Sequence, residues 1–242
     1  LKVATFAPSG ARRYRKRIEE SFQKVNEGNY ANLVVDLRGN GGGSSAMVEY
    51  LYSFLDSAGY NTPSNVIGKN SALASSRSSI MNSLLGDIIA FLFYAHNEDV
   101  QSFRHFAELP FGSMDTVFFI IPTKQLPAQV FPGRCFVLIN GLTASAAVDF
   151  TNAFKQRHRG TIVGQQCLGP VTGTWGNPAS FTLLNTGLRM SIATIRYNYD
   201  NSFLYDRNAI MPDHWVDCNA EDLNRKRDSQ LEFVINLLKK KP

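Results

Sequence analysis

The sequence predicts an α/β fold, and three observations carry that prediction. Two compact apolar runs, residues 33–35 and 135–139, have the continuous hydrophobicity of strands buried on both faces of a parallel sheet. A Gly- or Ser-bearing turn follows each run, and then a stretch with apolar residues at helical spacing. The 242 residues are 44% hydrophobic and 19% charged, which is a globular composition. Strand, turn and helix therefore alternate as they do in α/β proteins.

The elements before the first glycine-rich turn can be assigned in order. Residues 2–6 favour a short strand, which a Pro-Ser-Gly sequence ends. Residues 11–27 repeat apolar side chains on one helical face and stop at a glycine, as an amphipathic helix does. The first buried strand comes next. Beyond the glycines, Ser44 or Ser45 is suited to cap a further helix that ends near residue 55.

The middle of the chain is less regular. Residues 56–128 predict an irregular inserted segment, lid-like, within one domain of residues 1–242. We expect a helix over 81–95 and a strand over 117–121 inside this insertion. The regular pattern then resumes in this order: strand 135–139, helix 144–155, strand 161–164, Gly-rich loop 165–178, a hairpin of 180–184 with 188–196, and an amphipathic helix over 221–240.

Composition excludes several classes of protein. The longest apolar run, residues 88–95, is far too short to span a membrane as a helix. The net charge of +5 comes mostly from basic residues near the two ends; no nucleic-acid-binding motif accompanies them, so a solvated helix face is expected rather than a nucleic-acid partner. The three cysteines have no metal spacing, and we expect no metal and no cofactor. Because the chain begins at Leu1 without a signal peptide, we expect a shortened or processed chain; the oligomeric state stays open.

The first segment that suggests chemistry is LVVDLRGNGGG, residues 33–43. Gly41, Gly42 and Gly43 follow a buried strand and precede a helix, so their backbone can adopt positive φ and bring N–H groups close to an anion. An ordinary tight turn is the alternative from this segment alone. A phosphate-binding loop is not supported, since the sequence lacks the lysine of that motif.

The second such segment is NGLTASAAVD, residues 140–149, again a strand end, a turn and a helix start. Ser145 stands near the helix start, where a serine can simply be the N-cap. It can instead be a nucleophile, with the Ala146 N–H beside it. That amide and one from the glycine turn would form a two-donor oxyanion hole.

Taken together, these segments and the later VGQQ and MPDHWV resemble the S41 serine peptidases, which include the C-terminal (tail-specific) processing peptidases. The resemblance runs from the first strand to Val216 and implies a ClpP- or crotonase-like ββα-superhelix core; an upstream PDZ domain, frequent in the family, is not evident. It implies a serine-type peptidase that cleaves extended polypeptides through an acyl-enzyme, in the periplasm, cell envelope or extracellular space. It further implies that Ser145 is the nucleophile, that Ala146 and Gly42 supply the oxyanion amides, and that Gly41 and Gly43 are neighbours.

The sequence departs from this family at the general base. The lysine of the Ser–Lys dyad is missing, because its position falls near Pro170 and no lysine occurs between Lys155 and Lys226. The first strand also lacks the histidine of the tricorn-like branch. The other candidates for a base or its partner are Asp149, His96, His105, Tyr197 and Tyr199. His158 is expected at the end of the Ser145 helix as a partner of that helix end, and His214 follows a Pro-Asp turn that is structural in the family. Two alternatives remain open: a catalytically inactive S41-like domain that binds a peptide or apolar ligand, and a crotonase-like site for CoA thioesters.

Overall fold

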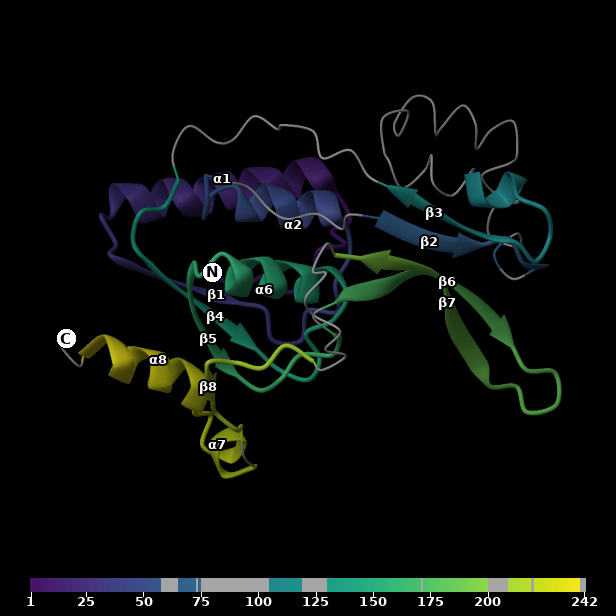
Figure 1. Ribbon diagram of the computed structural model, residues 1–242. Coiled ribbons are helices and arrows are strands. Elements are labelled where there is room, and N and C mark those ends of the chain that lie inside the picture. The colour runs from purple at the N-terminus through teal and green to yellow at the C-terminus, as the bar shows by residue number, and fades with distance from the viewer. Residues whose placement is uncertain are drawn as a thin grey trace. The chain divides into compact units, whose positions relative to one another are not determined.

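The computed structural model describes residues 1–57, 65–72, 74, 105–118, 130–170, 172–199, 209–218 and 220–239. It confirms the α/β prediction, with one parallel and one antiparallel sheet. The chain forms two compact units (Figure 1). The first unit comprises Leu1–Thr62, Thr123–Val171 and Leu204–Pro242, and the second comprises Pro63–Pro122 and Thr172–Phe203.

The first unit is built on a parallel sheet in the order β1-β4-β5-β8. Its strands are β1 (Asn32–Asp36), β4 (Arg134–Ile139), β5 (Gly160–Gly164) and β8 (His214–Trp215). The pairs β1–β4 and β4–β5 are in register along their whole length. The carboxyl ends of β1 and β4 therefore lie side by side, although 102 positions separate Asp36 from Leu138 in the sequence.

Helices cover both faces of this sheet. On one face lie α1 (Ala11–Glu27), α2 (Ser45–Tyr52) and α6 (Ala146–Gln156), packed on alternate residues of the strands such as Val35 and Val137. On the other face, α8 (Ser229–Lys239) packs on the intervening residues. Helix α6 is the most enclosed, since every residue from Ala146 to Phe154 is buried. Its first residue is therefore held firmly at the sheet edge.

The second unit is an antiparallel sheet in the order β3-β2-β7-β6. Its strands are β2 (Asn65–Lys69), β3 (Met114–Phe118), β6 (Gly173–Thr182) and β7 (Arg189–Asn198). A small core of Val66, Phe106 and Ile195 supports it. Both β2 and β3 come from the stretch expected as an insertion, and they pair within this unit with the hairpin of β6 and β7.

Three elements differ from the sequence predictions. Residues 2–6 make only isolated bridges at Lys2 and Phe6, because β1 ends at Asp36 and the neighbouring chain then turns. Strand β6 takes in much of the predicted Gly-rich loop. The closing helix is two helices, α7 (Ala220–Asn224) and α8, because Lys226 adopts positive φ between them. The predicted helix over 81–95 lies outside the described residues.

Candidate active site

The two segments singled out in the sequence meet at the carboxyl edge of the parallel sheet. A methyl group added at Gly42 would lie 2.6 Å from the Ser145 Cβ and 2.9 Å from the Ala146 nitrogen. Gly42 adopts φ +100, a conformation open to glycine and strained for other residues. The glycine turn thus lies against the Ser145 turn with no space for a side chain between them.

Asn40 ties these two turns together, and the sequence analysis missed it. The residue is fully buried; its Nδ2 donates to the Val3 carbonyl at 2.9 Å, and its Oδ1 accepts the Gly42 N–H at 2.9 Å. Its main-chain carbonyl accepts the Ala144 N–H at 2.9 Å. The signal was the amide side chain within the glycine run, because a buried amide must find several partners.

Ser145 itself has an unusual backbone. It adopts φ +51 and ψ −127, although it is not a glycine, and such conformations cost about 1–3 kcal/mol and cluster at functional sites. It occupies the N-cap position of α6, yet its hydroxyl makes no capping hydrogen bond. The side chain is partly exposed. The capping interpretation therefore loses its main support, and the strained turn instead presents the hydroxyl at the sheet edge.

Main-chain amides surround this turn. The Ala146 N–H is the first of α6 and has no partner inside the helix, so it carries the partial positive charge of a helix start. The Gly42 N–H is already donated to Asn40 Oδ1. To donate to an oxyanion, the Gly42 N–H would have to share or give up its hydrogen bond to Asn40 Oδ1. The Ala146 N–H has no partner inside the helix to give up.

The other two glycines of the run differ from Gly42. A methyl group at Gly43 would lie 2.1 Å from the Phe6 carbonyl carbon, so Gly43 permits close packing of the chain start on the loop. Gly41 has open space where a side chain would be. Only Gly42 lies directly against the Ser145 turn.

The predicted partners of Ser145 are dispersed. Asp149 is buried on α6, and its N–H donates to the Ser145 carbonyl at 3.1 Å. His158 follows the far end of α6, more than ten residues and about three helical turns beyond Ser145, too far for proton transfer with the hydroxyl. His214 lies on β8 with its ring 5.2 Å from that of Phe233.

The remaining candidates belong to other parts of the chain. His105, in the second unit, is half-exposed and its Nε2 lies 2.7 Å from Asp115 Oδ2. Tyr197 and Tyr199 also belong to the second unit. His96 lies outside the described residues. Among the described side chains, none forms a hydrogen bond with the Ser145 hydroxyl.

A thiol near this edge is not a second nucleophile. Cys167 is buried beside Leu168, whose N–H donates to the Thr143 carbonyl at 2.8 Å. Burial raises the pKa of the Cys167 thiol to about 11, so it stays protonated at neutral pH. Elsewhere in the described chain, His, Cys and acidic side chains do not gather in threes as a metal site would need.

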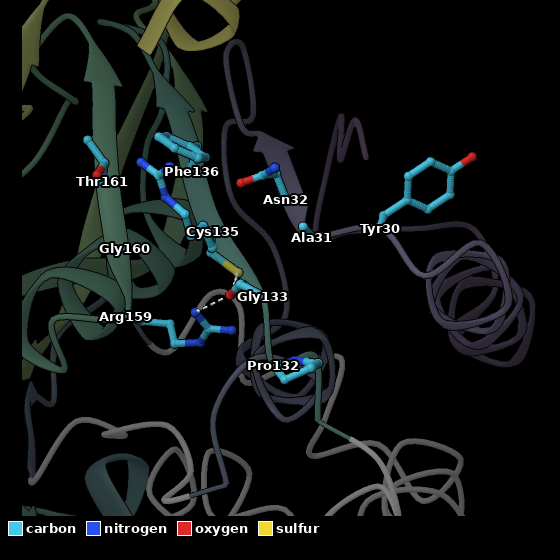
Figure 2. A pocket seen from close by; sticks show the side chains of 11 residues that line it. Tyr30, Ala31, Asn32, Pro132, Gly133, Cys135, Phe136, Arg159, Gly160 and Thr161 are labelled. Atoms are coloured by element: carbon cyan, nitrogen blue, oxygen red, sulfur yellow. Dashed lines mark hydrogen bonds between the residues drawn. The ribbon is translucent and has the colours of Figure 1, made fainter. Parts of the chain in front are cut away.

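The opposite, amino edge of the same sheet carries a cavity of about 700 Å³ (Figure 2). The starts of β1, β4 and β5 line it, with Tyr30 and Asn32 on one side and Gly160 and Thr161 on the other. Arg159 reaches back over it, and its guanidinium donates to the carbonyls of Leu55, Gly133 and Phe131. This side chain therefore holds the protein's own backbone, and the cavity lies at the end of the strands away from Ser145.

Comparison with known proteins completes the description of this site. The model of peptidase family S41 matches residues 1–216. No curated protein matches the chain. No helix within the described ranges is long and apolar enough to cross a membrane.

Three solved structures share the fold. A candidate peptidase from Parabacteroides merdae ATCC 43184 has a TM-score of 0.55 at 19% identity, covering 100% of this chain and 61% of its own. Mature CPAF has a TM-score of 0.54 at 17% identity, and the match covers 98% of this chain and 49% of CPAF. A candidate S41 protease from Bacteroides fragilis NCTC 9343 has a TM-score of 0.52 at 12% identity, and the match covers 96% of this chain and 51% of that protease. The chain therefore spans between half and three fifths of the length of these proteins.

Proposed function

Because this chain belongs to peptidase family S41, we propose that it is a serine peptidase that hydrolyses peptide bonds of extended polypeptides through an acyl-enzyme on Ser145. The Ser145 Oγ attacks the scissile carbonyl carbon, and the carbonyl electron pair moves onto its oxygen. The Ala146 N–H and an amide of the glycine turn stabilise that oxyanion. The C–N bond then breaks as the amine takes up the proton of the hydroxyl through a base, and water releases the acyl group.

One observation carries this proposal: the strained, partly exposed Ser145 turn packed against Gly42. A serine that served only as a helix cap would use its hydroxyl for the cap and would need no positive φ. A strained strand-to-helix turn that presents a serine hydroxyl beside the first amide of the helix is the arrangement by which unrelated hydrolases expose their nucleophile.

The test is covalent labelling together with turnover. We expect a fluorophosphonate probe to label Ser145 and Ser145→Ala to lower peptide hydrolysis by at least about 10³-fold. Ser21→Ala is the matched control, because the Ser21 hydroxyl bonds only the Arg17 carbonyl on the exposed face of α1. Labelling of the Ser145→Ala variant at the wild-type level would contradict the proposal.

A second candidate function has a specific observation in its favour. Within the described part of the chain no side chain hydrogen-bonds the Ser145 hydroxyl, and the family lysine is missing from the sequence. These facts favour an S41 domain without catalysis that binds an extended peptide. Peptide binding that is equal in the wild type and in Ser145→Ala, with no turnover in either, would select this alternative.

The resemblance to tail-specific peptidases adds two finer parts to the proposal: cleavage near the C-terminus of the substrate and a place in the periplasm, at the cell envelope or outside the cell. A peptide series with free and amidated C-termini tests the first part. Equal kcat/KM for both forms would contradict it. Fractionation of cells that produce the native protein tests the second part.

A further inference from the structure

A second cluster of charged groups lies at the base of the glycine turn. Arg38 uses all five N–H donors of its guanidinium. Two go to the Asp36 carboxylate at 2.8 Å each, two to the Asp228 carboxylate at 2.7 Å each, and one to Gln230 Oε1 at 3.2 Å. Such bidentate, charge-assisted pairs fix orientation as well as position. We call these four residues the Arg38 cluster.

The Arg38 cluster is joined to the Ser145 turn by a short path. Arg38 lies in the turn that the Asn40 N–H closes on the Leu37 carbonyl at 3.0 Å. Asn40 then holds both Gly42 and Ala144, and Ala144 directly precedes Ser145. A shift of the Arg38 turn therefore displaces the Asn40 carbonyl, which holds the Ser145 turn through Ala144, and the Asn40 side-chain amide, which holds the glycine turn through Gly42.

Half of this cluster comes from a part of the chain beyond the family match, which ends at residue 216. Asp228 also accepts the Leu231 N–H at 3.0 Å and so begins α8. Gln230 is almost fully buried, and its Nε2 donates to the Val216 carbonyl at 2.8 Å. Since α8 packs through Val234 on Phe136 and Leu138 of β4, these two side chains are anchored to the sheet.

The ion pairs of the Arg38 cluster are partly shielded from solvent. The side chains of Arg38 and Asp36 are 21% and 14% exposed, and that of Asp228 is 38% exposed. A surface pair of this kind would contribute little, but a network with one shared, fully used guanidinium holds several groups at once.

From this geometry we infer that Asp228 and Gln230 are positioning residues of the active site: through Arg38 they hold the glycine turn in the register that aims its amides at the Ser145 oxyanion. The inference rests on the proposed peptidase function. It deepens that function, because it makes the C-terminal helix α8 part of the catalytic apparatus although it lies outside the family core. The oxyanion amides act mainly in the transition state, so their misplacement should affect kcat rather than KM.

The experiment compares Asp228→Asn with Glu232→Gln in the full chain. Asp228→Asn keeps size and loses the charge, and we expect kcat to fall about 10- to 100-fold with KM changed by less than about twofold. Glu232, in the first turn of α8, forms an exposed pair with Arg227 just before that helix, and we expect Glu232→Gln to leave kcat unchanged. Asp228→Glu, which restores the carboxylate, should recover at least about a third of the activity. A wild-type kcat in Asp228→Asn would overturn the inference.

A second readout does not depend on catalysis. Amide hydrogen exchange of residues 37–46 should be about tenfold faster in Asp228→Asn than in the wild type, and unchanged in Glu232→Gln. If Ser145 proves unreactive in the wild type, the peptidase proposal fails, while the exchange result still decides whether α8 holds the glycine turn. Exchange at the wild-type rate in Asp228→Asn would overturn the inference on its own.

Discussion

The amino and carboxyl edges of the parallel sheet differ in whether their polar groups are already bonded within the protein. The amino edge has a cavity of about 700 Å³, yet Arg159, which lines it, donates to three backbone carbonyls of the protein itself. The carboxyl edge combines a strained serine, a hydroxyl without a capping bond and the first amide of a helix. The candidate site is marked by a residue in a strained backbone conformation, Ser145, whose hydroxyl is not used in a capping hydrogen bond.

The largest effect is expected from a methyl group at the junction of the two turns. Gly42→Ala would place a Cβ 2.6 Å from the Ser145 Cβ at a φ that alanine rarely adopts, so we expect kcat/KM to fall by more than about 10³-fold. Gly141→Ala is the matched control, because a Cβ there has no neighbour within 4 Å and its φ is not in the strained range. Full activity in Gly42→Ala would remove the site from this edge.

Asn40 tests whether the carboxyl edge depends on a buried amide. Asn40→Ala removes its bonds to Val3 and Gly42, and we expect a loss of about 2 kcal/mol in unfolding free energy and about 10²-fold in kcat. Asn32→Ala, at the exposed rim of the amino-edge cavity, is the control and should change neither quantity. Chemical denaturation and steady-state kinetics on both variants provide the measurement. Equal behaviour of the two variants would erase the contrast between the edges.

Much of this contrast could be foreseen in the sequence, and part could not. The strand, turn and helix order around residues 33–43 and 135–149 suggested two turns that share an oxyanion hole. The structure places the two turns at one edge because β1 and β4 are neighbouring parallel strands. The roles of the residues there stay proposals. The partners of Asn40 and Arg38 were out of reach of local patterns, because Arg38 and Asp228 are 190 positions apart. Lys226 at positive φ broke the last helix without the glycine or asparagine that usually signals such a turn.

Arg159 tests the amino edge. Arg159→Met keeps the apolar stem but removes the guanidinium donors from the carbonyls of Leu55, Gly133 and Phe131. We expect a loss of about 2 kcal/mol in unfolding free energy with kcat per folded molecule unchanged. Thermal unfolding and active-site titration separate the two quantities. A fall in kcat with full stability would instead give the amino edge a catalytic role.

The backbone strain at Ser145 makes a smaller and opposite prediction. Ser145→Gly relieves the positive φ, whereas Ser145→Ala retains it and removes only the hydroxyl. Both variants should be inactive, but the glycine variant should be more stable than the alanine variant by about 1 kcal/mol. Denaturant titration of the two proteins side by side measures the difference. An alanine variant as stable as the glycine variant would mean that the turn stores no strain.

The smallest effect concerns pH and the Arg38 cluster. Hydrogen bonds from Arg38 lower the pKa of Asp228, and the same guanidinium outweighs burial and lowers the pKa of Asp36, both from an ordinary 3.8. Their folded-state pKa values lie below the unfolded ones, so the unfolded chain binds more protons in acid. The stabilisation is therefore complete above about pH 5 and is lost as pH falls through the folded-state values. In Asp228→Asn the decline in unfolding free energy below about pH 5 should be shallower, by about 0.5 kcal/mol because the carboxylate is partly exposed. Glu232→Gln is not a control for this measurement, because a hydrogen bond from Arg227 also lowers the pKa of Glu232. Loss of the Glu232 carboxylate should therefore also make the decline of the unfolding free energy in acid shallower. An Asp228→Asn curve parallel to that of the wild type down to pH 2 would show that Arg38 does not hold this carboxylate in solution.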